Sequence, residues 1–586
     1  MNEATFGRIP QQVVEIVQPL CALTYGTAPC AAALGVTGSD RCYNTRATCQ
    51  DGDNYDGSGA VNLYFRAPGS REVPGIVSLP FLGKVSTVPT VVNFASVDTD
   101  RSPLGTRATV NISMLDGISS DGRVDPYVDQ RAFDPLTRST FWRKWMTRNR
   151  YRTALSVRVY SGYEGQTLAE MVRREYVMEG ISGPGRNGGF TIIAKDILSR
   201  VEGTKAQAPA ASPGRLSADI TEDALALSIA EAGVSDYPAP GLIRIGGEII
   251  AYSGSVLNGT TGNVDITVTA RGQGGTIPDS HAQDASVQWC LVYDDQRPDQ
   301  IISDLLTTYG GIDAGYIPSA EWEAEAVDWV AFARLGTVIS EPTSVGQLVG
   351  EVCEQGLVNV WWDERTQQIR LFAFRPPFYL PPVLDEASTI IADSLSITER
   401  PENRLSQVWV YYNRRNVAEG IDDVSNYRDL RIRIDPEAET ADQYGEPRVK
   451  KIFGRWLVLG PWAGYVCSRF LNRRRETQRV MTFDVDAKDR SIDVGEIYRV
   501  DTWEDVDQYG QPRQGYWQVF SVEETAHGHV SQVMLEEIAP GQRYGLIMAG
   551  DDPDYTAADA DQMITGFWIS DANGKYSDGS EGKLIL

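Results

Sequence analysis

Residues 21–30 read CALTYGTAPC and residues 41–51 read RCYNTRATCQD, and together they hold four of the seven cysteines of the 586-residue chain. The other three, Cys290, Cys353 and Cys467, stand singly in apolar surroundings, which is typical of buried free thiols. Clustering near the beginning of the chain indicates that this region folds around sulfur. The group is a metal or iron–sulfur site, a set of disulfides or a set of buried thiols.

The spacing of Cys21, Cys30, Cys42 and Cys49 leaves eight, eleven and six residues between successive cysteines. No pair has the short spacing that zinc fingers usually require. Iron–sulfur clusters accept wider spacing when the fold gathers the thiolates. The start of the chain shows no signal peptide, so we expect synthesis in a reducing cytoplasm, where clustered cysteines bind metal more often than they form disulfides.

Composition predicts a mainly β protein with some α+β elements and several domains. The chain is too long for one core, and it has 55 Gly, 30 Pro, 26 Tyr and 13 Trp. No apolar run is long enough to span a bilayer, so we expect no stable membrane anchor. The net charge of −25 disfavours binding to DNA phosphates. It suits either solubility alone or a passage through which DNA slides without sticking.

Turn signals and changes of periodicity divide the chain into six parts. A Pro/Ala/Ser-rich linker precedes a compact β insertion, whose hairpin signal is Gly246-Gly247 in GLIRIGGEIIAYSG. Two helical patterns and the hairpin VNVWWDERTQQIRLFAFRPP follow. The predicted parts are a cysteine-rich domain 1–60, a β domain 61–205, the linker and insertion 206–295, an α+β domain 296–400, a further β domain 401–550 and an acidic extension 551–586.

The basic and aromatic run FWRKWMTRNRYR (141–152) predicts an amphipathic helix. Phe141, Trp142 and Trp145 would pack inward, whereas Arg148 and its basic neighbours would face water or acidic groups. Nucleic-acid binding is the alternative interpretation.

No catalytic constellation is evident. The histidines lie in no HExxH motif, and no GxSxG motif occurs. ARGQGGT (270–276) lacks the Lys-Ser/Thr of a phosphate-binding loop, so it predicts a turn. We therefore expect no enzymatic activity.

Four segments of the sequence resemble segments of the tail-tip proteins of long-tailed bacteriophages. They are CALTYGTAPC…RCYNTRATCQDGDNY, STFWRKWMTRNRYR…LSVRVYSGY, GLIRIGGEIIAYSG…TARGQGGT…HAQDASVQ and LVGEVCEQGLVNVWWDERTQQIRLFAFRPP. In that family they belong to the baseplate hub, which is similar in plan to the hub of gene transfer agents. The resemblance covers roughly residues 10–550.

The resemblance implies a homotrimeric hub of β-barrel modules of the tail-tube type, located at the distal end of the virion tail. Its partners would be the distal-tail protein ring, the tape measure protein and a central fibre or spike. The hub would join the tail tube to the fibre and form part of the DNA channel during host attachment and genome delivery. The alternatives are a tail-associated cell-wall hydrolase and a receptor-binding protein.

The resemblance also implies a 4Fe–4S cluster, because cysteine-rich domains of tail-tip relatives bind one. Cys21, Cys30, Cys42 and Cys49 would each supply a thiolate. Zinc, or no metal, is the alternative.

Overall fold

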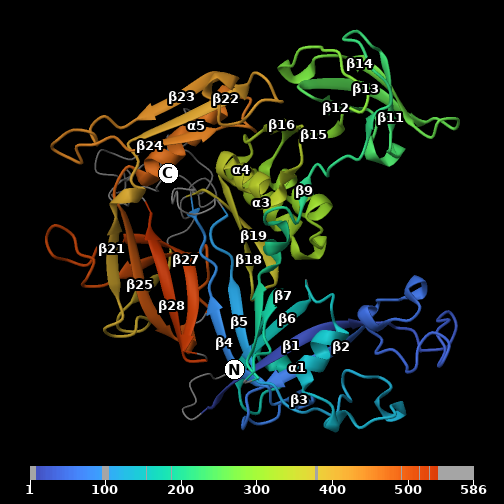
Figure 1. The fold of residues 1–586 in the computed structure, drawn as a ribbon. Helices are drawn as coiled ribbons and strands as arrows, with labels where there is room; N and C mark the ends of the chain where they lie inside the picture. Colours follow the sequence, from blue (N-terminus) through green and yellow to red (C-terminus); the bar gives the residue numbers. More distant parts are fainter. Residues whose placement is uncertain are drawn as a thin grey trace.

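The computed structural model describes residues 8–538 except 95–103, 154, 187, 376–380, 490, 514 and 527. It confirms the predicted mainly β class, with 37% strand and 19% helix. Three large sheets, a smaller sheet and a helical centre build the molecule (Figure 1). The predicted acidic extension 551–586 lies outside the described residues. None of the helices in the described part is long and apolar enough to cross a membrane.

The first sheet has eight strands, and helix α1 (Phe141–Arg148) packs on it as the apolar positions predict. The Trp142 ring stacks between Phe65 and Phe190, with centroids 5.0 and 4.4 Å away. The strand order is β3-β2-β1-β6-β7-β8-β5-β4. The strands are β1 (Pro10–Leu20), β2 (Gly59–Arg66), β3 (Ser78–Leu79), β4 (Leu82–Val88), β5 (Thr109–Met114), β6 (Ser156–Tyr163), β7 (Val172–Ser182) and β8 (Phe190–Lys195).

Arg148 faces an acidic group, which is one of the two predicted alternatives. It is buried, and it shares the Asp121 carboxylate with Lys144 at N–O distances of 2.9 and 2.7 Å. Both basic residues therefore hold the 119–125 loop against the helix.

The cysteine-rich segment is the connection between β1 and β2, which pair in antiparallel fashion from Val13↔Arg66 to Leu20↔Gly59. The expected domain 1–60 is therefore narrower in the structure, because residues 10–20 belong to the first sheet. The apolar residues of β1 fix this strand in the first sheet, because Val14 and Ile16 are fully buried in the core that the sheet shares with α1.

The second sheet contains the predicted insertion, and its hairpin turns at Gly246-Gly247 as predicted. Part of the expected linker is fixed, because β9 (Gln207–Ala208) pairs with β17 (Thr343–Ser344). The sheet order is β10-β11-β14-β13-β12-β15-β16. The strands are β10 (Arg215–Leu216), β11 (Ala226–Ala230), β12 (Gly241–Ile245), β13 (Glu248–Leu257), β14 (Val264–Ala270), β15 (Val287–Gln296) and β16 (Leu335–Ile339).

The helical centre and the smaller sheet share one core, although they come from different predicted domains. Gln355 connects them, because its Oε1 accepts from the Trp456 backbone N–H at 2.9 Å and its carbonyl accepts from Trp462 Nε1 at 2.8 Å. The elements are α2 (Pro298–Asp304) with a π-turn (Leu305–Tyr309), α3 (Ser319–Val330), α4 (Val345–Gly356), β18 (Val358–Asp363), β19 (Gln368–Ala373), β22 (Gln407–Arg414), β23 (Tyr427–Ile434), β24 (Val449–Phe453) and α5 (Gly460–Arg474).

The third sheet takes strands from both sides of the predicted boundary at residue 400. Its order is β20-β26-β27-β28-β25-β21. The strands are β20 (Val383–Asp385), β21 (Ser396–Arg400), β25 (Gln478–Asp486), β26 (Ile497–Asp501), β27 (Gly515–Ala526) and β28 (Val530–Glu537). Residues 405–471 therefore lie between strands of the third sheet in sequence but pack with the preceding domain. No local turn signal in the sequence predicts this arrangement.

The turn predicted in ARGQGGT attaches the insertion to the smaller sheet. The Gly274 carbonyl accepts from Val417 N at 3.0 Å, and a Cβ on Gly275 would lie 1.7 Å from the Arg415 carbonyl. Glu248 organises this turn from within, since its buried carboxylate accepts from Arg271 and from His281.

Acid is expected to loosen this attachment. Burial raises the pKa of Glu248, but hydrogen bonds from Arg271, His281 and two backbone N–H groups hold it below the ordinary 4.5. The stability that the site contributes is therefore present above pH 4.5 and lost as the pH falls through the lowered pKa. Hydrogen exchange of residues 270–281 should rise in that range. Glu248→Gln should raise it already at neutral pH, whereas Glu231→Gln, at an exposed position, should leave it unchanged.

Candidate cluster site and charged junction

The structure brings all four clustered cysteines to one cavity. Cys21 follows β1 directly, Cys30 ends the turn at 25–29, and Cys42 and Cys49 lie on either side of a single 3-10 turn (Arg46–Thr48). Leu23, Ala32 and the rings of Tyr25 and Tyr55 complete much of the lining. Residues that are separate in sequence therefore present their thiols to one small, largely apolar space.

The void between the thiols is about 10 Å³, roughly the room of one water molecule. A metal bonded to sulfur lies at about 2.3 Å, closer than a water molecule approaches it, so the void understates the room for a coordinated group. Burial raises the pKa of the Cys42 thiol, and the nearby Cys49, Cys30 and Cys21 raise it further. The four sulfurs therefore influence one another electrostatically.

All seven cysteines are free, so the structure contains none of the disulfides considered from the sequence. Within the described residues, no group of three His, Cys, Asp or Glu side chains is arranged to hold a metal ion. The four thiols therefore line one cavity, but their side chains are not arranged around a metal ion. Cys290, Cys353 and Cys467 are buried, as predicted, and none of them lines this cavity.

An arginine from outside the segment holds the cysteine loop. Arg131 forms a two-pronged ion pair with Asp125, both contacts at 2.8 Å, and donates to the Cys42 carbonyl at 3.0 Å. Its guanidinium lies over the Tyr43 ring, 3.9 Å from the centroid. Tyr127 adds a second hold, because its hydroxyl accepts from the Tyr25 backbone N–H at 2.8 Å. No sequence motif pointed to Arg131 or Tyr127.

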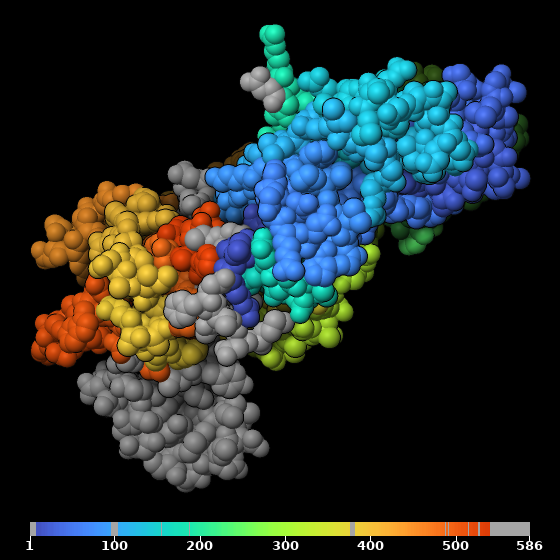
Figure 2. Space-filling view, turned by 90° about the horizontal axis from the view of Figure 1, so that it is seen from below, coloured from blue at the N-terminus to red at the C-terminus, as the bar shows by residue number. Residues whose placement is uncertain are grey.

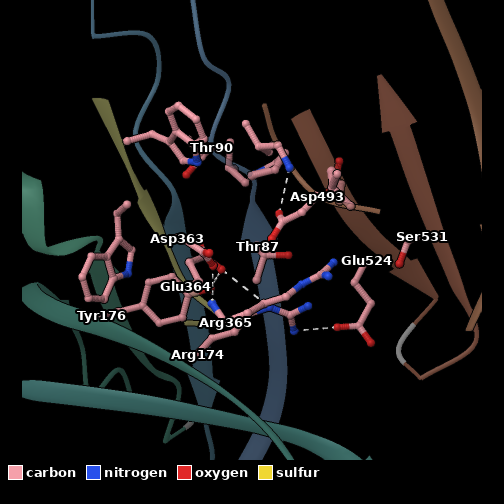
Figure 3. Close-up of a pocket in the computed structure, with 17 residues that line it drawn as sticks. Thr87, Thr90, Arg174, Tyr176, Asp363, Glu364, Arg365, Asp493, Glu524 and Ser531 are labelled. Atoms are coloured by element: carbon pink, nitrogen blue, oxygen red, sulfur yellow. Dashed lines mark hydrogen bonds and ion pairs between the residues drawn. The ribbon is translucent and has the colours of Figure 1, made fainter. Parts of the chain in front are cut away.

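Distant parts of the chain meet at a second polar site, the charged junction, centred on Arg174 of β7 (Figure 3). Arg174 pairs with Glu524 of the third sheet at 2.7 Å and with Glu364 of the β18–β19 turn at 3.6 Å. The Tyr176 hydroxyl donates to Glu364 at 2.9 Å. Burial raises the pKa of Glu364, and the charge of Arg174 opposes that rise. Seen from below, the blue and cyan part lies beside the orange and red part that this junction joins (Figure 2).

The charged junction has several carboxylates, among them Asp363, Glu364 and Asp493, but it has no room for a sugar between them. Its cavity is about 70 Å³, well below the roughly 300 Å³ at which ligand pockets begin. A hollow of about 340 Å³ opens beside it, between β6 and the turn after β27, but Glu524 is the one carboxylate among the described residues that line it. Two carboxyl groups on opposite sides of a sugar are needed. The charges of the junction connect β7, the β18–β19 turn and the third sheet to one another.

The fold comparison returns phage tail proteins. A 43 kDa tail protein of prophage MuSo2 from Shewanella oneidensis shares 9% identity over 78% of this chain and 97% of its own, with a TM-score of 0.34. A tail protein of Neisseria meningitidis shares 13% over 56% and 92%, with a TM-score of 0.28. A chain of a gene transfer agent virion shares 13% over 57% and 86%, with a TM-score of 0.31. No family model and no curated protein matches the sequence.

Removal of the central cation is expected to open the junction. Arg174→Met removes the cation that pairs with both Glu364 and Glu524 in a partly buried site, which should lower the free energy of unfolding by about 1–3 kcal/mol. Chemical denaturation followed by tryptophan fluorescence measures this change.

The matched control is the double variant Arg174→Met/Glu524→Gln. It also removes one of the two carboxylate charges that Arg174 balances. It should recover part of the lost stability. A double variant less stable than both single variants would contradict the assigned pairing.

Proposed function

We propose that this chain is the structural hub of a phage tail tip, joining the tail tube to a central fibre and forming part of the DNA channel. The observation that supports it best is the charged junction, which ties sheets from both ends of the chain into one body. A hub must hold its modules rigidly between two partners, and partly buried ion pairs with fixed geometry suit that task.

The oligomeric state and the partners in this proposal come from the sequence resemblance to baseplate hubs. They are a homotrimer around an axial channel, a distal-tail ring and tape measure protein on one side, and a fibre or spike on the other. The net charge of −25 suits a wall along which DNA moves without binding. The role proposed is structural, with no reaction assigned to the chain.

We propose further that Cys21, Cys30, Cys42 and Cys49 hold a 4Fe–4S cluster. The support is geometric: four free thiols from separate turns line one small, largely apolar cavity. A four-iron cluster takes one thiolate on each iron. The cysteine segment has little regular structure of its own, so a bound cluster would cross-link its turns and stabilise them.

The position of the chain in the virion tests the hub proposal. Gold-labelled antibody against residues 217–295 should mark the distal tip of tails in electron micrographs, and the purified chain should have the mass of three copies in light scattering. Labelling along the tube or at the head would contradict the proposal.

Anaerobic purification tests the cluster. Wild-type protein should be brown, with about four irons and four sulfides per chain, and Cys42→Ser should lose most of the iron. Cys353→Ser, which changes a buried thiol away from the cavity, should keep it. Circular dichroism shows whether each variant remains folded. Stoichiometric zinc, or iron that survives in Cys42→Ser, would contradict the assignment.

A further inference from the structure

The smaller sheet has one covered face and one exposed face. Helix α5 packs on the face that carries Val408, Val410 and Ile452, all buried (Figure 1). The pairing registers Trp409↔Ile432 and Trp409↔Lys451 place these residues together on the opposite face, because directly paired residues point the same way. That opposite face, called the outer face below, consists of Gln407, Trp409, Tyr411, Leu430, Ile432, Ile434, Val449, Lys451 and Phe453.

The outer face is apolar where a solvated sheet face would be polar. Seven of its nine side chains are aliphatic or aromatic. Leu430, Ile432, Ile434 and Val449 are 41, 43, 49 and 42% exposed, and the rings of Tyr411 and Phe453 stack at 5.4 Å between centroids. A contiguous apolar surface of this kind marks an interaction site.

The strands that edge the outer face are basic, although the whole chain is strongly acidic. Of the five basic residues of β23 and β24, Arg428 and Lys451 point to the outer face, and no acidic residue of these two strands accompanies them there. The other three, Arg431, Arg433 and Lys450, point to the face that α5 covers, where Lys450 pairs with Glu354. β23 is also an edge strand, and Arg428 to Ile434 are all exposed along it. An acidic protein surface is the complement of this combination of apolar and basic groups.

We infer that the outer face is the surface through which copies of this chain join. Another copy, with its net charge of −25, is an acidic partner that complements Arg428 and Lys451 on the outer face. The inference rests on the proposed function, in which several copies form the hub. It adds the place of contact: the apolar row of β23 and the three aromatic rings would be buried against the next copy.

A single-stranded nucleic acid is the other class of partner that an aromatic and basic sheet face can bind. The aliphatic row Leu430, Ile432 and Ile434 argues against it, because phosphates and sugars would leave these side chains in contact with charge and water. The acidity of the remaining chain also repels nucleic acid.

Ile432→Glu tests the inference, because it places a charge in the middle of the apolar row. Self-association, measured by analytical ultracentrifugation of the full chain over a concentration series, should weaken about a hundredfold or more. Ile118→Glu is the matched control: the same change at a residue that follows β5 of the first sheet and is 63% exposed should leave association unchanged. Far-UV circular dichroism and thermal unfolding verify that both variants fold.

The outcomes separate this inference from the proposed hub. A wild-type chain that associates, with Ile432→Glu folded and largely monomeric, supports the outer face as the contact. Association that persists in Ile432→Glu overturns the inference and leaves the hub intact, whereas a wild-type chain that stays monomeric at every concentration overturns both. Binding of a fluorescent oligothymidine that Ile432→Glu abolishes would assign the face to nucleic acid and overturn the inference.

Discussion

Arg174 is the cation on which the arrangement of the sheets depends. It leaves the first sheet on β7 and meets Glu364 from the helical centre and Glu524 from the third sheet. These carboxylates lie 190 and 350 residues further along the chain. Because the charges are partly withdrawn from water, each would be costly to leave without its partner. The ion pairs therefore penalise any arrangement in which one sheet moves away from the other two.

The same principle operates on a smaller scale at the other contacts between parts of the chain. Arg131 holds the cysteine loop through Asp125 and the Cys42 carbonyl, and Glu248 shapes the turn that docks the insertion. In each case a buried charge from one segment satisfies backbone or side-chain groups of another. The apolar cores build the separate sheets, and charged groups fix how the sheets and loops sit together.

Local patterns predicted the elements well. The helix around Trp142, the hairpin at Gly246-Gly247 and the hairpin from Val358 to Ala373 all follow from periodicity and turn chemistry, which act over a few residues. The domain boundaries were less predictable. Residues 405–471 interrupt the third sheet and join the core of α4, because contacts such as Gln355 with Trp456 span about a hundred residues. The helical pattern left open whether Arg148 faces water or an acidic group, and the fold decided for Asp121, which lies 27 residues earlier in the chain.

The sequence by itself determined that four cysteines lie close together in the chain and that their spacing does not suit a zinc finger. It also determined the mainly β class, through the alternation and turn residues of each strand. Only the tertiary structure decided that the four thiols line one cavity, that β1 and β2 enclose the cysteine segment, and that the outer face remains exposed. The physical reason is range: strand and turn preferences act between neighbours, whereas shared cavities, buried ion pairs and uncovered faces arise when distant segments meet.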